Sequence, residues 1–433
     1  MTAGTGAVPR RTVVAFLLVR GFSSAAYFTL VPFLGLWLIR TRDMDGVEGG
    51  TVVAACLLFG KAGGLLVSRL ITALGLRRSV LVSYVIATTA LLLMVAYQGR
   101  ALPVWVVLAS LLGLSFSAAT AALKALVAAA HSAEERLRGF SHLNLAVNAG
   151  AALGSAAGGV LLTHFPSTLP VLGVVLYLCA TLAALRLPRP AAPGTEDAGA
   201  VEGAGGAGRT RRPFLVFLGV TMLTWVAYAQ VFDVLPTYAA DSPGPQQVSL
   251  LFVANALLII VLQTPVTSFV QRLEARRPGA VELWVVPGAH LLMAVSVVVF
   301  ALVVRSPVVV GYVAVLLFTL SELVWGPIYH TKVVEVKGRM TNVTAYSLAG
   351  LAWGVAESGG TWLGMALVTA AGLSWPMATG MYWISALAMV AAALYFAVHA
   401  RAAGRPAASG KRATAPAHAP PASGGESSGT RAE

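Results

Sequence analysis

Seven charged side chains lie inside long apolar stretches of this 433-residue chain, where a charge could carry a proton or pair with an opposite charge. A charge in the hydrocarbon of a bilayer costs about 2.5 to 3.5 kcal/mol on insertion scales, so such residues normally face water or a partner. All four bases precede all three acids along the chain: Arg20, Lys61, Arg69 and Lys124, then Asp233, Glu322 and Glu357. We therefore expect proton coupling or ion pairing between two halves of the molecule.

Two of the acids are candidates for proton coupling. Glu322 is central in its apolar stretch, and burial among aromatic residues favours the neutral form of a carboxyl, so it is the first candidate for a proton carrier. A permanent ion pair is the alternative interpretation. Asp233 is the second candidate, but Arg20 and Lys124 are available as charge partners, and we expect Asp233 and Lys124 to be energetically coupled.

Polar and aromatic residues recur at helical spacing on four of the apolar stretches, as a cavity-facing stripe should. The stripes are Arg20, Ser24 and Tyr27; Gly113, Ser117, Thr120 and Lys124; Gln230, Asp233 and Thr237; and Phe318, Glu322, Trp325 and Tyr329. On a further stretch, Asn144 and Asn148 lie one turn apart and could bind a solute or bridge to a neighbouring helix. We expect these residues to line a cavity for a small-molecule substrate.

Membrane helices must position these residues. Soluble proteins carry about a quarter charged residues, whereas this chain carries 11%, with 57% hydrophobic residues. Division at the charged and Pro/Gly clusters gives twelve segments long enough to span a bilayer. Their approximate limits are 13–39, 51–73, 79–97, 104–130, 140–163, 168–187, 214–240, 247–271, 281–304, 308–330, 341–370 and 376–398. The expected fold is therefore an all-α integral membrane protein with twelve transmembrane helices.

A hydrophilic stretch divides the twelve segments into six plus six. Residues 188–213 have the composition of a linker, so we expect bundles at 13–187 and 214–398. Residues 1–12 and 399–433 lack an apolar pattern and are expected to be disordered. The halves also resemble each other at an offset of 200, which aligns glycines of the fifth and eleventh segments: Gly150, Gly154 and Gly159 with Gly350, Gly354 and Gly359.

The basic residues predict the orientation of the chain. If both termini are cytoplasmic, 22 of the 30 Lys and Arg residues lie on that side and only four on the other. This bias predicts a multi-pass protein of the cell membrane, the inner membrane where there are two, with cytoplasmic termini, linker and tail. The net charge of +13 does not predict a nucleic-acid partner, because the charges fall between apolar runs.

Other function classes lack their signatures in the sequence. The two cysteines lie in separate apolar runs without metal-ligand spacing, and no GxxxxGK[ST] loop occurs. No nucleophile with a paired base stands in a credible loop, so we expect neither an enzyme nor a cofactor or metal. A receptor would need a signalling domain that is not visible. Receptor and membrane enzyme remain the remote alternatives.

Two motifs are similar to those of the major facilitator superfamily. The loop after the second segment, SRLITALGLRRSV, resembles G-x-L-a-D-r-x-G-r-(R/K) and keeps Gly75, Arg77 and Arg78, but Ser68 replaces the first Gly and Thr72 the Asp. The fifth segment, GAALGSAAGGVL, resembles the G-x-x-x-G-P-x-x-G-G motif of drug:proton antiporters. Its matching glycines, which also suit plain helix packing, are Gly150, Gly154, Gly158 and Gly159.

The resemblance covers residues 12–398 and implies two six-helix bundles around a central cavity lined by the first, fourth, seventh and tenth helices. It implies a monomeric secondary transporter in the lipid bilayer, here expected to export an amphipathic drug or secondary metabolite by proton antiport. Proton-coupled uptake of a small solute such as a peptide is the alternative. Lys124, Asp233 and Glu322 are similar to the peptide transporter layout, although the E-x-x-E-R signature of that family is missing and only Arg20 is present.

Overall fold

The protein is helical throughout the part that the computed structural model describes, which comprises residues 9–130, 133–188, 211–338, 340, 342–370 and 372–403. Eleven helices in these ranges are long and apolar enough to cross a membrane. A twelfth helix, α13 (Asn342–Thr369), is equally long but more polar, and it completes the expected set of twelve spans. The termini and most of the linker, 189–210, lie outside the described residues.

The first six spans form the N-terminal bundle. They are α1 (Arg10–Leu30) continued by η1 (Val31–Phe33) and α2 (Leu34–Arg42), then α3 (Gly46–Leu74), α4 (Leu76–Ala96), α5 (Leu102–Ala130), α6 (Ala133–His164), and α7 (Leu169–Ala184) preceded by η2 (Pro166–Thr168). Helices overrun the expected limits at several ends. The largest difference is at α6, because helical geometry continues beyond its apolar residues.

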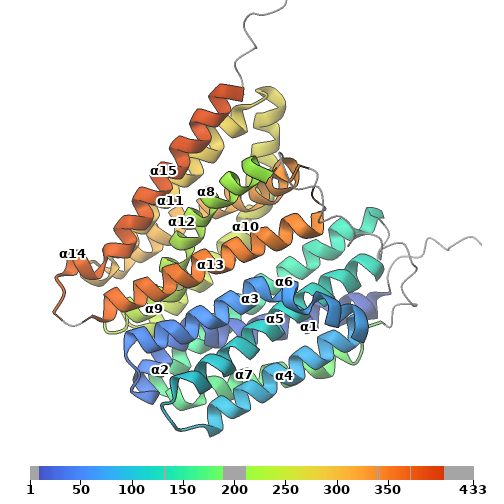
Figure 1. Ribbon diagram of the computed structural model, residues 1–433, viewed down its shortest axis with the longest axis vertical. Helices are drawn as coiled ribbons and strands as arrows, with labels where there is room; N and C mark the ends of the chain where they lie inside the picture. The colour runs from blue at the N-terminus through green and yellow to red at the C-terminus, as the bar shows by residue number, and fades with distance from the viewer. Residues whose placement is uncertain are drawn as a thin grey trace, which may run out of the picture.

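The last six spans form the C-terminal bundle. They are α8 (Arg211–Ala229) continued by η4 (Gln230–Val234) and α9 (Leu235–Tyr238), α10 (Pro245–Arg276), α11 (Val286–Ala301) flanked by η5 (Val281–Val285) and η6 (Val303–Arg305), α12 (Val308–Val336), α13, and α15 (Gly380–Ala403) preceded by α14 (Trp375–Ala378). Figure 1 shows the two bundles as separate groups of roughly parallel helices.

The first and seventh spans are both interrupted near the same end. Pro32 lies in the short 3₁₀ segment η1, and Pro236 follows the π-helical segment η4. Proline lacks a backbone N–H and clashes with the preceding turn, so a span that contains it must change its hydrogen-bonding pattern locally. In the seventh span the π segment carries Gln230 and Asp233, so the irregular turn positions two polar side chains.

The two bundles meet at one end and diverge toward the other (Figure 1). We call the end with the start of α1 and the end of α15 the terminal face, and the end with α2, α9 and α14 the opposite face. At the opposite face, Arg40 of α2 donates a 2.8 Å hydrogen bond to the carbonyl of Ala240, just after α9. Toward the terminal face the helices of the two bundles lie farther apart than at the opposite face (Figure 1).

Glycines set the close approach of the helices within the N-terminal bundle. β carbons built on Gly150, Gly154 and Gly158 of α6 would lie 2.4 to 2.5 Å from backbone carbonyl oxygens of α1. Only glycine allows two helix backbones to come this close. The glycine motif of the fifth segment therefore lies at a helix–helix contact inside its own bundle.

Two seams join the bundles. In the α6–α10 seam, a β carbon on Gly159 would lie 2.3 Å from the side chain of Ser249. In the α3–α13 seam, β carbons on Gly350 and Gly354 would lie 3.1 Å from the Lys61 carbonyl oxygen and 3.2 Å from its Cβ. Both seams rest on small residues, but the second also holds charged groups.

Candidate functional site

Glu322 lies at mid-length of α12, and its side chain is partly exposed. Its carboxylate accepts a 3.1 Å hydrogen bond from Nδ2 of Asn255 on α10, which also donates to Thr319 at 3.0 Å. The hydroxyl of Tyr228 interacts with the same carboxyl. No base forms an ion pair with Glu322 in the described part of the chain. A carboxyl with neutral partners can exchange a proton without breaking an ion pair.

Aromatic rings surround the inner part of this site. Tyr228 and Phe318 meet edge to face with centroids 4.9 Å apart, and Phe232 lies 5.5 Å from Phe318. On the next turn of α8, Trp225 stacks on Trp353 of α13 at 3.8 Å and nearly parallel. Stacked and edge-to-face pairs stabilise by about 0.5 to 1.5 kcal/mol each, so these contacts stabilise the wall.

Asp233 is buried in the η4 segment and does not meet the partners expected from the sequence. Its carboxylate accepts a 3.0 Å hydrogen bond from Thr361 of α13, and among the described residues no ion pair joins it to Arg20 or Lys124. Gln230, three residues earlier, donates to the Gly360 carbonyl at 3.0 Å. Both side chains therefore tie the irregular turn to α13 within the C-terminal bundle.

The ion pair between the halves joins Lys61 and Glu357 instead. Lys61 Nζ on α3 lies 3.4 Å from the carboxylate of Glu357 on α13, and 3.9 Å from the ring centre of Trp353. Glu357 is buried, whereas Lys61 is partly exposed. The sequence analysis does not predict this pair. The spacing of Trp353 and Glu357, one turn apart, was the available signal, because an ammonium can bind both a carboxylate and a ring face.

Arg20 points into the N-terminal bundle and not toward the second half. Its guanidinium donates a 2.8 Å hydrogen bond to Thr120 and lies 5.0 Å from the ring centre of Phe116, both on α5. A buried guanidinium needs such contacts because it cannot lose its proton. The expectation that Arg20 is a cavity charge partner therefore does not fit this structure.

The stripe on the fourth span mainly packs against other helices of its own bundle. A β carbon on Gly113 would lie 2.1 Å from the Cys56 carbonyl oxygen, and one on Gly63 would lie 3.2 Å from Ser117 Cβ. Lys124, the last residue of the stripe, is exposed. Small residues favour close contacts between helices. Gly113 and Ser117 are therefore buried within the bundle, and Lys124 is the exposed residue of this stripe.

The remaining first-span and tenth-span candidates are also buried. Ser24 lies against Gly150, and Tyr27 stacks on Phe116 with ring centroids 4.0 Å apart. Trp325 packs against His290 and Tyr329. Through Tyr329 and Trp225, Trp325 is connected to the aromatic wall near Glu322, whereas Tyr27 packs inside the N-terminal bundle. The periodicity test found a polar helix face but could not distinguish a cavity from a bundle interior.

Two other groups of candidates lie nearer the terminal face. Asn144 of α6 is exposed, and its carbonyl accepts a 3.0 Å hydrogen bond from Asn148, which is partly exposed. In the loop motif, Gly75 has a φ of +81°, which permits the sharp turn between α3 and α4. Arg77 donates to the carbonyl of Leu185, and Arg78 follows it in the first turn of α4.

The family follows from these features together with a match to the model of the Major Facilitator Superfamily over residues 16–358. This chain belongs to that superfamily, and it is therefore a multi-pass membrane transporter and not an enzyme. No curated protein sequence matches it.

Solved structures of transporters share the fold. The POT family transporter PepTSo is 13% identical, with a TM-score of 0.75 over 92% of this chain and 99% of that chain. An auto-inhibited POT family peptide transporter is 13% identical, with a TM-score of 0.72 over 91% and 97%. The nucleoside transporter NupG is 12% identical, with a TM-score of 0.67 over 89% and 99%. At these identities the likeness concerns the fold alone.

Proposed function

We propose that this protein is a proton-coupled transporter of a small amphipathic solute, in which Glu322 carries the proton. The observation that supports this most is the bonding of Glu322: its carboxyl accepts a hydrogen bond from the Asn255 amide and, among the described residues, forms no ion pair with a base. Such a carboxyl can be protonated from the open side and release the proton when the bundles rearrange around it. Asp233, buried beside Thr361, is the second proton-coupling candidate.

Export by antiport is the direction that we propose first. It is supported by the likeness of Gly150, Gly154, Gly158 and Gly159 to the drug:proton antiporter motif. The solute would be a drug or secondary metabolite with an apolar body. In this proposal the solute is loaded from the terminal face, toward which the two bundles diverge (Figure 1).

Uptake of a peptide-like solute is the second candidate. Lys124 on one bundle is exposed and Glu322 on the other is partly exposed, and in the described part of the chain neither has an ion-pair partner. A zwitterion with a carboxylate at one end and an amine at the other would suit this pair. The fold likeness to POT family peptide transporters adds support.

We also propose that the terminal face is cytoplasmic, that the membrane is the cell membrane, and that the transporter is a monomer. The orientation rests on the excess of basic residues expected at that face. A reporter fused after Arg401 tests it. Alkaline phosphatase activity at that position would contradict the orientation.

The proton role is tested with Glu322→Gln in inside-out vesicles carrying an imposed pH gradient. The amide mimics the neutral carboxyl, so this variant should still exchange substrate across the membrane but lose accumulation against a gradient.

A panel of lipophilic cations and labelled dipeptides, offered in both directions, separates export from uptake. Asn255→Asp is the matched variant, because it places a second carboxyl beside the first and should shift the pH profile of transport.

Uphill transport by Glu322→Gln with an unchanged pH profile would show that another group carries the proton. Asp233 would then be tested in the same assay. Failure of every solute to move in either direction, with the protein correctly folded, would contradict transport of this class of compound.

A further inference from the structure

A groove lies at the terminal face between α1 and α7. Its volume is about 740 Å³, and its charged lining comes from three arginines, Arg10, Arg11 and Arg186. Val14 and Leu18 of α1 continue the groove toward the middle of the span. The groove is separate from the site around Glu322, because it is formed by α1, the end of α7 and the turn that follows α7.

The arginines of this groove have no acid near them among the described side chains. Within residues 9–188, the described acidic side chains are Asp43, Asp45 and Glu48, and all three lie at the opposite face. No ion pair in the described part of the chain involves the three arginines. Arg77 adds a fourth positive charge nearby, because it donates to the carbonyl of Leu185.

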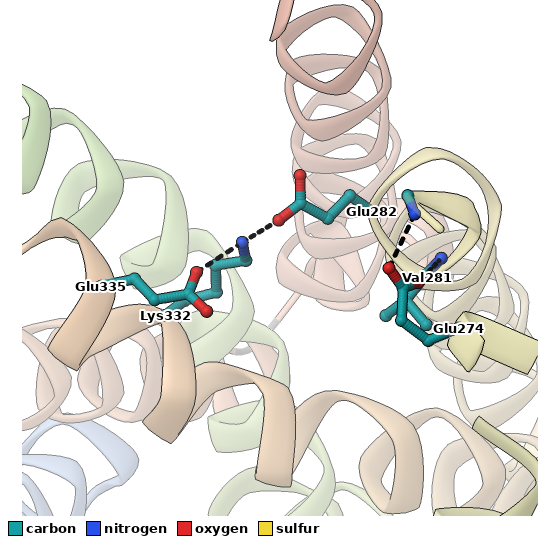
Figure 2. A network of polar contacts seen from close by, with 6 residues as sticks. Glu274, Val281, Glu282, Lys332 and Glu335 are labelled. Atoms are coloured by element: carbon teal, nitrogen blue, oxygen red, sulfur yellow. Dashed lines mark hydrogen bonds and ion pairs between the residues drawn. The ribbon is translucent and has the colours of Figure 1, made fainter. Parts of the chain in front are cut away.

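Some charged side chains of the C-terminal bundle at this face do have partners. Figure 2 shows Lys332 between Glu282 and Glu335, with the second contact at 2.7 Å. Glu274 accepts hydrogen bonds from the backbone N–H groups of Gly279 and Val281 at 2.7 and 3.0 Å. Lys332 and Glu274 therefore have partners inside the protein there, whereas Arg272, Arg276 and Arg277 of the same bundle, like the groove arginines, form no ion pair among the described residues.

The floor of the groove is apolar and faces outward. Val14 and Leu18 are 42% and 37% exposed, and Leu182 and Leu185 beside Arg186 are 65% and 53% exposed. Exposed apolar side chains on a membrane-spanning helix contact lipid tails. A cationic rim above an apolar floor matches a molecule with an anionic head and hydrocarbon chains, and guanidinium groups bind phosphate oxygens in pairs.

We propose that the groove between α1 and α7 binds the phosphate head group of an anionic phospholipid, with the acyl chains along Val14 and Leu18. The shared chemistry is a phosphate anion, and the apolar floor indicates a lipid as its source. Basic pockets between membrane helices are known to recognise such head groups. This inference depends on the membrane location of the chain and not on the proposed substrate or proton carrier.

The test compares delipidated wild-type protein with the triple variant Arg10→Gln, Arg11→Gln, Arg186→Gln. Each is titrated with phosphatidylglycerol or phosphatidylcholine in detergent, and bound lipid is counted by native mass spectrometry. Each arginine near an anionic surface contributes about fivefold in affinity, so the triple variant should bind phosphatidylglycerol roughly a hundredfold more weakly. The control is Arg272→Gln, Arg276→Gln, Arg277→Gln, which removes the same charge from the other bundle.

The proposal is supported if the wild type and the control retain phosphatidylglycerol in preference to phosphatidylcholine while the groove variant does not. Equal losses of phosphatidylglycerol binding in both triple variants would show a general effect of charge and overturn the proposal.

A second arm of the experiment adds inorganic phosphate alone. If phosphate protects the wild type against heat as well as phosphatidylglycerol does, the site takes a free anion and the lipid assignment fails. Val14→Asn gives a further check, since it should weaken lipid binding without a change in charge.

Discussion

The two seams between the bundles differ in what holds them together. The α6–α10 seam is a contact of small residues, in which Gly159 leaves no room between α6 and Ser249. The α3–α13 seam includes the Lys61–Glu357 ion pair and a 3.1 Å hydrogen bond from Trp362 to Thr51. A close-packed contact tolerates rocking about a fixed point, whereas a polar contact has discrete bonded and broken states. The first seam thus suits a pivot and the second a latch.

The largest expected effect is at the close-packed seam. Gly159→Val places atoms where Ser249 already lies and should force α6 and α10 apart, because overpacking costs about 1 to 3 kcal/mol. We expect a lower melting temperature and a longer spin-label distance between α2 and α9. Gly359→Val is the matched control, because a β carbon there meets nothing within 4 Å. Similar behaviour of the two variants would show that the α6–α10 contact is not a pivot.

An intermediate effect is expected at the polar seam. Glu357→Gln leaves Lys61 without its anion, and breaking a fully buried pair costs about 3 to 5 kcal/mol. Because the Lys61 side chain is 28% exposed, we expect roughly 1 to 2 kcal/mol. The double variant Lys61→Met, Glu357→Leu should recover part of this loss in thermal unfolding. Strictly additive losses would mean that the two charges do not stabilise the seam together.

The smallest expected effect is a coupling energy between pairs of side chains, which distinguishes contacts within a bundle from contacts between bundles. Asp233→Asn and Lys124→Gln should be additive within about 0.5 kcal/mol, because the structure does not bring these side chains together. Asp233→Asn and Thr361→Val should instead couple by about 1 kcal/mol through their hydrogen bond. The free energy of unfolding, measured for the single and double variants of both cycles, distinguishes coupled from independent side chains. Strong coupling of Asp233 to Lys124 would indicate a second conformation in which they meet.

Hydropathy predicted the architecture well because lipid requires each span to be long, apolar and helical. All twelve expected segments correspond to helical spans, and α13 was found although it is more polar than the others.

The similarity between the halves at an offset of 200 residues was less informative about helix contacts. Gly150 faces α1 of its own bundle, whereas Gly350 faces Lys61 across the seam. Equal spacing in sequence does not fix which neighbour a glycine meets.

The charged residues were harder to place, for a physical reason. Periodicity shows which residues share a helix face, but the rotation of that face depends on packing against several other helices. Arg20 and Asp233 were thus expected to face each other, yet they bond to Thr120 and Thr361 of their own bundles. The sequence indicates that Glu322 lies at mid-span, but its Asn255 partner is on α10, so this hydrogen bond depends on tertiary packing that the sequence pattern does not reveal.

The polarity of α13 has a consequence for how the protein is made. A helix that carries Glu357, Thr361 and several glycines partitions poorly from the insertion machinery into lipid on its own. Its polar groups find their partners on α3 and η4, which are synthesised earlier. We therefore expect stable insertion of α13 to depend on two helices already in the membrane, α3 of the N-terminal bundle and the seventh span of its own bundle.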